Sequence, residues 1–287
     1  MTKKFQDIAA VDGVSYTLTA GVYGLLGVNG AGKTTLMRML CTLLRPTSGS
    51  ITWDGRDIFE MDGEYRRILG YLPQDFGYYP DFTVYDYLMY IASIKGLRPV
   101  TAETRAEALL RQVGLAEARN KKMKKLSGGM KRRAGIAQAM LGDPRILILD
   151  EPTAGLDPNE RIRFRNLISE LAEERLVLLS THIVSDIEYI AGEILLMKDG
   201  QIKASGTIQE LLAAMPEQVW SVNLPKAAVE SYMKSYKVSN VKTVPGGAQL
   251  RIISAKKPAD DAAPETATLE DLFLDYFGEQ VEGDPEI

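Results

Sequence analysis

Apolar residues along this chain fall into short continuous runs separated by stretches with helical spacing. Continuous runs of this length are typical of strands buried on both faces, and three of them lie at residues 22–26, 145–150 and 176–180. Apolar positions recur at helical spacing in the segments beside them, at residues 34–44, 84–119 and 161–174. Strands that alternate with helices in this way predict an α/β fold, with a parallel sheet covered on both faces.

Shorter patterns predict further strands around this core. Alternating or apolar stretches of strand length lie at residues 50–53, 68–72, 194–197 and 201–204. Asp54-Gly55 follows the first of them as a turn, and Asp199-Gly200 joins the last two. A two-residue Asp-Gly connection is typical of a tight β-hairpin, so the last two stretches are expected to pair with each other.

The composition changes beyond about residue 214. The elements expected there are strands at 217–224 and 248–254 and a helix at 225–236. The segment 256–267 is rich in Ala, Pro and acidic residues and is predicted to be a mobile linker. A last helix is expected from Thr268 to Gly278. We therefore predict a main domain over residues 1–214 and a small α+β appendage over residues 215–287.

The overall composition is that of an ordinary soluble globular protein, with 45% apolar and 25% charged residues. The formal net charge of −4 makes nucleic acid an unexpected partner. Cys41 is the only cysteine, so an intrachain disulfide is excluded. No stretch approaches the roughly 20 apolar residues that cross a bilayer. Met1–Asp7 contains no long apolar run after its lysines, so it is not expected to be a secretory signal. If the protein acts at a membrane, we expect it to do so from the cytoplasmic face of that membrane, through a partner protein.

The strongest local motif is Gly27-Val28-Asn29-Gly30-Ala31-Gly32-Lys33-Thr34-Thr35, which fits the phosphate-binding pattern G-x-x-x-x-G-K-[ST]. It lies between a predicted strand and a predicted helix, which is the context that the motif requires. Glycine lets backbone N–H groups approach phosphate oxygens without a clashing Cβ, and the helix N-terminus adds its positive end. Lys33 is expected to reach the β- and γ-phosphates of a bound nucleotide, and Thr34 to bind Mg²⁺.

The second candidate for phosphate chemistry is an acid pair at the end of a buried strand. Asp150 ends the run at 145–150, and Glu151 follows it directly. Neighbouring residues of an extended chain point to different places. One carboxylate can therefore serve a metal ion while the other polarises an attacking water. We predict that Asp150 holds Mg²⁺ and that Glu151 is the base.

Further motifs separate this chain from P-loop kinases and GTPases. They are, in chain order, Gln74, Leu126-Ser127-Gly128-Gly129-Met130, Ala154-Gly155-Leu156-Asp157 and His182. In this order they closely resemble the nucleotide-binding domain of ATP-binding cassette (ABC) transporters, over roughly residues 5–214. The resemblance implies a P-loop NTPase fold with a RecA-like mixed-sheet core, an antiparallel β part and a helical subdomain at about residues 75–143.

The resemblance also implies roles for individual residues. Nucleotide binding is implied for Phe5, Asn29, Gly30, Ala31, Gly32, Lys33, Thr34, Thr35, Ser127, Gly128, Gly129 and Asp157. A catalytic role is implied for Glu151, His182, Gln74 and Lys33, and metal binding for Thr34, Gln74 and Asp150. Phe5 stands where the family stacks an aromatic ring on adenine, and His182 matches the switch histidine that contacts the γ-phosphate.

Two positions depart from the family pattern. Met130 ends the Ser-Gly-Gly signature where glutamine is commoner. The backbone donors from Ser127 to Gly129 remain, so the signature is expected to work. The chain also begins almost at Phe5, so the strand that usually precedes this aromatic is expected to be missing or reduced to a few residues.

The resemblance implies a head-to-tail homodimer around two ATP molecules, in which the signature of one copy faces the γ-phosphate held by the other. It also implies a separate transmembrane permease as partner and a place on the cytoplasmic face of the membrane. Three stretches are similar to export-type members that pair with ABC-2-type permeases: Thr83–Leu88, Ser127–Arg133 and Thr268–Phe273. The transported substrate is selected by the permease.

Alternatives remain for the whole chain and for two of its segments. A soluble cassette ATPase acting on ribosomes, DNA repair or chromosomes usually has two cassettes, long coiled coils or zinc cysteines, so one cassette with one cysteine favours the transporter. The basic residues at 121–125 and 131–133 indicate a solvated face, with attraction to an anionic membrane as the alternative. Seven aromatic residues after Gln74 form either a permease-docking groove or the subdomain's own core: Phe76, Tyr78, Tyr79, Phe82, Tyr85, Tyr87 and Tyr90.

Overall fold

The computed structural model describes residues 1–172 and 175–278, which form two compact units that divide between Lys203 and Ala204. The sequence placed this division after residue 214. The short helix α9 (Ile208–Ala213) explains the difference, because it contacts α11 (Leu269–Phe277) within the second unit.

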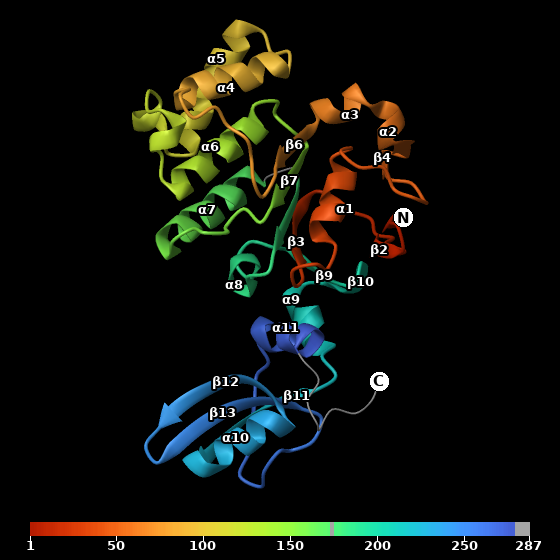
Figure 1. Cartoon of the computed structure of the whole chain (residues 1–287), viewed down its shortest axis with the longest axis vertical. Helices are drawn as coiled ribbons and strands as arrows, with labels where there is room; N and C mark the ends of the chain where they lie inside the picture. The colour runs from red at the N-terminus through yellow and green to blue at the C-terminus, as the bar shows by residue number, and fades with distance from the viewer. Residues whose placement is uncertain (173–174, 279–287) are drawn as a thin grey trace. The chain divides into compact units, whose positions relative to one another are not determined.

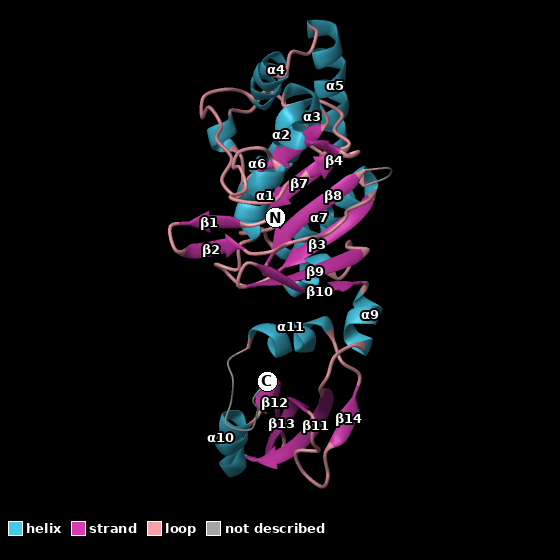
Figure 2. Ribbon diagram, turned by 90° about the vertical axis from the view of Figure 1, so that its right-hand side faces the viewer, coloured by secondary structure: helices cyan, strands magenta, loops and turns pink. Residues whose placement is uncertain are grey.

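A six-stranded sheet forms the centre of the first unit, in the order β10-β9-β3-β8-β7-β6 (Figures 1 and 2). Its strands are β3 (Gly21–Leu26), β6 (Leu69–Leu72), β7 (Ile146–Asp150), β8 (Leu176–Thr181), β9 (Glu193–Lys198) and β10 (Gln201–Gly206). β3 is parallel to β8 and β9, and β7 is parallel to β6 and β8. β10 returns beside β9 through Asp199-Gly200, where both residues have positive φ. The predicted α/β fold with a mixed sheet is confirmed.

The register of the parallel strands brings their carboxyl ends to one edge of this sheet. The pairs nearest that edge are Leu26 with Thr181, Asp150 with Ser180, and Leu72 with Leu149. The segments that follow these strands carry the predicted phosphate loop, Glu151, His182 and Gln74. Ligands of open α/β sheets bind outside the carboxyl ends of the strands. The fold therefore brings the predicted functional residues to the edge of the sheet where a ligand would bind.

Helices cover both faces of the sheet, as the two views in Figures 1 and 2 show. On one face lies α1 (Lys33–Leu40), and on the other lie α6 (Gly128–Met140) and α7 (Pro158–Leu171). Met37 of α1 packs in one cluster with Leu25, Ile148 and Leu178 from three neighbouring strands. Burial of each such side chain stabilises the fold by about 1.5–3 kcal/mol. Residues 173–174, the last two of the helix predicted at 161–174, lie outside the described residues.

The segment predicted to be helical from 84 to 119 contains two helices rather than one. Gly96 has φ 73°, and Pro99 lacks the N–H that a continuous helix needs, so the chain turns between them. The Thr83 and Asp86 side chains form a capping box that starts the first helix. The elements here are α4 (Val84–Ile94), α5 (Pro99–Gln112) and two 3₁₀ turns, Ala116–Ala118 and Met123–Lys125.

Two antiparallel pairs and three short helices complete the first unit. They are β1 (Lys3–Phe5) with β2 (Ile8–Val11), β4 (Thr52–Trp53) with β5 (Arg56–Asp57), α2 (Ile58–Met61), α3 (Gly63–Arg67) and α8 (Val184–Ile187). The strand that the sequence expected to be missing or reduced is present as β1, three residues long and ending at Phe5.

The second unit is built on a four-stranded antiparallel sheet in the order β12-β13-β11-β14. Its elements are β11 (Gln218–Pro225), α10 (Lys226–Ser235), β12 (Lys237–Val244), β13 (Gly247–Ser254) and β14 (Ala263–Glu265). The sequence did not predict β12, whose middle residues are exposed and mostly polar. β14 lies within the segment 256–267 that was predicted to be a linker. Residues 279–287 of the predicted appendage lie outside the described residues.

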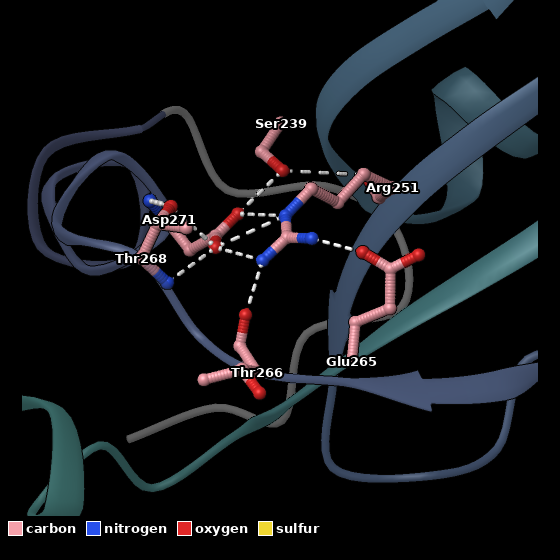
Figure 3. A network of polar contacts seen from close by, with 6 residues as sticks. All are labelled: Ser239, Arg251, Glu265, Thr266, Thr268 and Asp271. Atoms are coloured by element: carbon pink, nitrogen blue, oxygen red, sulfur yellow. Dashed lines mark hydrogen bonds and ion pairs between the residues drawn. The ribbon is translucent and has the colours of Figure 1, made fainter.

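A polar network holds α11 against the sheet of the second unit (Figure 3). Asp271 is 1% exposed and accepts hydrogen bonds from Ser239 Oγ at 2.6 Å and from Arg251 Nη2 at 2.7 Å. Its carboxylate also closes the capping box with Thr268 at the start of α11. Burial alone would raise the pKa of Asp271, but the hydrogen bonds from Arg251, Ser239 and Thr268 outweigh it and lower the pKa.

Among the helices described, none combines the length and the apolar character that a membrane crossing requires.

Candidate nucleotide site

The phosphate loop, residues 27–35, joins β3 to α1 at the carboxyl edge of the sheet. A Cβ on Gly27 would lie 2.3 Å from the carbonyl oxygen of Met197, and a Cβ on Gly32 would lie 2.1 Å from that of Ala10. Gly32 also has φ 102°, so glycine is required there for two reasons. The Cβ position of Gly30 has no atom within 4 Å. The loop is therefore packed tightly on the protein side and has open space beside Gly30.

Lys33 is held at the base of this loop. Its Nζ donates to the carbonyl oxygens of Gly27 at 2.6 Å and Val28 at 3.1 Å. The same atom lies 3.7 Å from Oε1 of Glu151. Burial lowers the pKa of Lys33, and the nearby Glu151 and Asp150 carboxylates oppose that effect. The ammonium group is thus fixed between the loop and the acid pair.

Asp150 ends β7 and is 1% exposed. Its Oδ1 accepts hydrogen bonds from Ser180 Oγ at 2.6 Å and from Thr34 Oγ1 at 3.3 Å. Its Oδ2 is buried without a hydrogen-bond partner among the described residues. A buried carboxylate oxygen with no donor is unfavourable unless a cation compensates it. Carboxylate and hydroxyl oxygens are the donors that Mg²⁺ prefers, so Asp150 and Thr34 fit this metal.

Glu151 and His182 meet beside Lys33. Nδ1 of His182 lies 3.0 Å from Oε2 of Glu151, although Oε2 has no hydrogen bond of acceptable geometry. The Glu151 side chain is 6% exposed, whereas that of His182 is 45% exposed. Glu151 has φ 47°, a left-handed conformation that is uncommon outside glycine. The sequence predicted both residues, and the structure brings them together with Lys33, Thr34 and Asp150.

Ser180 is a site residue that the sequence analysis missed. It is fully buried at the carboxyl end of β8. Its hydroxyl donates to Asp150 Oδ1 and accepts a hydrogen bond from the backbone N–H of Glu151 at 2.9 Å. One side chain therefore positions both members of the acid pair. The available signal was a polar residue at the end of a strand that is apolar up to that position.

Gln74 lies two residues after the end of β6, and its side chain is exposed. The aromatic residues that follow divide into two groups. Tyr87 is 3% exposed and packs with Phe76 in the helical subdomain. Tyr79 and Tyr90 are 49% and 38% exposed and lie with their hydroxyls 3.2 Å apart. Tyr87 therefore belongs to the core of the subdomain, whereas permease docking stays a prediction for the exposed Tyr79 and Tyr90.

The signature residues form the start of α6. Ser127 is its N-cap and accepts a hydrogen bond from the backbone N–H of Met130 at 3.2 Å. Ser127 and Gly128 are exposed, whereas Gly129 is buried. A Cβ on Gly129 would lie 2.7 Å from a carboxylate oxygen of Glu160, at the start of α7. The helix N-terminus therefore presents Ser127 and Gly128 to solvent and is anchored through Gly129.

Asp157 is exposed and caps α7 by accepting a hydrogen bond from Glu160 N at 2.9 Å. The loop that leads to it is tied to the segment after His182 by a buried carboxylate. Asp186 is 2% exposed, accepts a hydrogen bond from Thr153 Oγ1 and lies 3.7 Å from Arg161 Nη1. The sequence gave no indication of this connection.

Phe5 is the last residue of β1, and 48% of its surface is exposed. Lys3 Nζ lies 5.3 Å from the ring centroid. The paired strand β2 borders the phosphate loop through Ala10 and Gly32. The Phe5 ring is thus exposed on a hairpin whose second strand touches the phosphate loop.

Comparisons with known proteins point in one direction. The family model described as ABC transporter matches residues 11–154. The uncharacterized ABC transporter ATP-binding protein YxlF of Bacillus subtilis is 37% identical over 235 residues, which are 82% of this chain and 78% of that protein. The Nod factor export ATP-binding protein I of Burkholderia lata is 37% identical over 212 residues, 73% of this chain and 70% of that protein. The probable multidrug ABC transporter ATP-binding protein YbhF of Escherichia coli is 37% identical over 97% of this chain, which spans 51% of that protein.

Solved structures give the same result for the fold. The chain aligns with cbiO1 from Clostridium perfringens, part of the ABC transporter complex cbiONQ, at a TM-score of 0.66 and 28% identity, over 74% of this chain and 88% of that one. The dimeric bacterial ABC transporter cassette MJ0796 aligns at a TM-score of 0.64 and 26% identity, over 72% of this chain and 95% of that one.

Proposed function

The chain belongs to the ABC transporter family of ATP-binding proteins, whose ATP-binding domains hydrolyse ATP to drive transport, and on that premise we propose that it powers an exporter through a separate ABC-2-type permease. The names of two relatives, a multidrug protein and a Nod factor export protein, support export. The chain would act at the cytoplasmic face of the membrane, held there by the permease.

In this proposal the phosphate loop binds the triphosphate of ATP. Backbone N–H groups from Asn29 to Thr35 and the N-terminus of α1 stabilise the phosphate charge. Lys33 contacts the β- and γ-phosphates, for which its ammonium must leave at least part of its contact with the Gly27 and Val28 carbonyls. Phe5 stacks on the adenine ring.

Glu151 is the proposed general base. Its buried carboxylate lies between Lys33 Nζ and His182 Nδ1, at 3.7 Å and 3.0 Å. A carboxylate in this place can accept a proton from water, while the two cationic or donor groups stabilise charge that develops on phosphate. Gln74 orients the attacking water, and His182 contacts the γ-phosphate. Hydrolysis forms a bond from the water oxygen to the γ-phosphorus and breaks the bond from that phosphorus to the β–γ bridging oxygen. The products are ADP and phosphate.

Mg²⁺ is the proposed metal, held by Thr34, Gln74 and Asp150. The partnerless Oδ2 of Asp150 supports this assignment. When bound, the ion neutralises phosphate charge.

Two copies of the chain are proposed to close head to tail around two ATP molecules. Ser127 and Gly128 are exposed at the N-terminus of a 13-residue helix, which can bind an anion carried by another subunit. The dimeric cassette MJ0796 supports such an arrangement by similarity. Asp157 is proposed to contact the partner copy, and its exposure on the loop that follows Glu151 supports this.

The observation that carries the proposal is the meeting of Lys33, Asp150, Glu151 and His182 at one edge of the sheet. The experiment is co-purification of the tagged chain with the membrane protein encoded beside its gene, followed by transport into inside-out vesicles. Co-purification and ATP-dependent accumulation of a dye or drug inside the vesicles are expected. ATP hydrolysis without any membrane partner would instead favour a cassette ATPase that acts on a non-membrane partner.

A further inference from the structure

We propose that Arg132 is a positioning residue for ATP hydrolysis, which holds the backbone of Glu151 and of Pro73 in register with the helix that carries the Ser-Gly-Gly turn. Its position in the chain, among the basic residues after the signature, suggests a solvated surface charge. In the structure Arg132 is instead half-buried, and its guanidinium contacts backbone carbonyls at the carboxyl edge of the central sheet.

The guanidinium of Arg132 joins the ends of two neighbouring strands. Its Nη1 donates to the carbonyl oxygen of Pro73 at 3.3 Å, and its Nη2 donates to that of Glu151 at 3.2 Å. Pro73 directly follows β6, and Glu151 directly follows β7, which are parallel neighbours in the sheet. A planar group with several fixed donors can span two such acceptors, whereas a lysine ammonium is a single point. Arg132 thus fixes the separation of these two loop starts.

The backbone of Glu151 needs such support. Its φ of 47° is a left-handed conformation, which is strained for a residue with a side chain. The N–H of Glu151 donates to Ser180 Oγ at 2.9 Å. Its carbonyl oxygen accepts from Arg132 and, at 3.3 Å, from the N–H of Ala154. Contacts at both ends of the residue therefore set the direction of its carboxylate, and Arg132 provides one that comes from a different part of the chain.

The helix that carries Arg132 is itself fixed to β6. Gln138 Nε2 donates to the carbonyl oxygen of Tyr71 at 2.9 Å. A Cβ on Gly135 would lie 2.7 Å from Leu72 and 3.1 Å from Phe76, so α6 approaches β6 closely. Since α6 begins with Ser127 and Gly128, a shift of the signature is transmitted through Arg132 to the backbone of Glu151. This link to the signature rests on the proposed function, whereas the effect on Glu151 does not.

The charge of Arg132 is also suited to this place. Burial lowers its pKa, while the carboxylates of Asp75, Asp150 and Glu151 oppose that effect. The guanidinium remains charged at physiological pH because the pKa of arginine is so high. It therefore adds a fixed positive charge near the acid pair.

The experiment compares ATP hydrolysis by the purified full chain with that of Arg132→Gln and Arg132→Lys. For Arg132→Gln we expect kcat to fall about 10- to 100-fold, as for a misplaced catalytic group, while KM for ATP changes less than about twofold because the phosphate loop is untouched. Arg132→Lys keeps the charge but not the double contact, so its kcat should lie between that of the wild type and that of Arg132→Gln. The matched control is Arg105→Gln, which removes a guanidinium contact to the carbonyl oxygen of Leu141 at 3.0 Å in the helical subdomain, and it should keep the wild-type kcat.

The outcomes separate this inference from the proposed function. Wild-type kcat in Arg132→Gln would overturn the inference, and so would an equal loss in Arg105→Gln, since the effect would then be one of general stability. If Arg132→Gln does not fold, Arg132→Lys decides: a lowered kcat at unchanged KM supports positioning, and an unchanged kcat contradicts it. Each ratio is measured on the isolated chain, so a missing permease or absent export bears on the proposed function alone.

Discussion

The ammonium of Lys33 lies 3.7 Å from a carboxylate oxygen of Glu151, and both side chains are only 6% exposed. Two such groups attract strongly because little water screens them. Lys33 belongs to the phosphate loop, and Glu151 directly follows β7. The contact therefore joins the part of the site proposed to bind phosphate with the group proposed to activate water.

The first prediction concerns Glu151→Gln. The substitution keeps the size of the side chain but removes the base, so kcat should fall about 10²- to 10⁴-fold. ATP binding should persist, because the substitution leaves Lys33 and the phosphate loop unchanged and Asp150 still lies near Lys33. Since ATP is bound and not consumed, the variant should form a lasting dimer. Phosphate release and size-exclusion chromatography with ATP measure the two effects.

The control for this variant is Glu64→Gln, which makes the same change in an exposed surface pair with Arg56. Its kcat should equal that of the wild type. Near-normal hydrolysis by Glu151→Gln would remove Glu151 from the role of base.

The second prediction concerns Ser180→Ala. The variant leaves the Glu151 N–H without its acceptor and removes a donor from Asp150 Oδ1. Each lost hydrogen bond to a charged or buried group costs about 1–3 kcal/mol, so kcat should fall about tenfold or more. The apparent affinity for Mg²⁺ should also change, which a titration of activity against Mg²⁺ concentration measures. Ser185→Ala, at an exposed serine of α8, is the comparison; if both variants retain full activity, Ser180 does not position the acid pair.

The contrast between Glu151 and Ser180 indicates which residues of the site could be predicted from the sequence. Glu151 belongs to a motif of neighbouring residues, and the strand before it is recognisable by its apolar run. Ser180 and Arg132 act on Glu151 from other segments of the chain, and neither lies in a motif that implies the contact. Arg132 was even grouped with solvated charges, because a sequence shows the charge of a side chain but not its direction.

The fold shows the same division. The phosphate loop and the central strands were predictable because continuous apolar runs and glycine spacing are local signals. β12 was not predicted, because its residues are little buried and its apolar and polar residues alternate only weakly. Its pairing depends on β13, which comes later in the chain. The break between α4 and α5 did have a local signal in Gly96 and Pro99, which the helical spacing obscured.

The third prediction concerns permease binding by exposed aromatic residues. The Tyr79 ring stacks on Phe82 at 4.8 Å and meets Tyr90 edge-on at 5.2 Å. Exposed aromatic clusters of this kind often carry binding energy, with about 2 kcal/mol or more at a central residue. The double variant Tyr79→Ala and Tyr90→Ala should therefore lower co-purification with the permease at least about tenfold. ATP hydrolysis by the isolated chain should be little changed.

Tyr189→Ala serves as the control for surface aromatics, since Tyr189 is 71% exposed and lies over Arg165, outside the helical subdomain. It should leave permease capture unchanged. Undiminished capture by the Tyr79 and Tyr90 double variant would count against docking at this cluster.

The last prediction concerns the network around Asp271 in the second unit. Asp271→Asn removes the charge that pairs with Arg251 while Arg251 stays partly buried, which should destabilise the second unit by about 3 kcal/mol at neutral pH. Trp220 lies in this unit, and its Nε1 donates to the carbonyl oxygen of Ser254. Its fluorescence in a Trp53→Phe background therefore reports the unfolding of this unit in urea. Glu230→Gln, at the exposed pair with Lys234, should change the midpoint little.

The effect of pH follows from the direction of the shift. The network lowers the pKa of Asp271 in the folded protein below its ordinary value, which is about 3.9 in an unfolded chain. The stabilisation is therefore complete above about pH 4 and is lost as the pH falls through the lower, folded value. The difference between wild type and Asp271→Asn should accordingly be constant from neutral pH down to that region and shrink below it. A difference that shrinks as the pH rises from neutral would show that the charge of Asp271 is not what holds α11 in place.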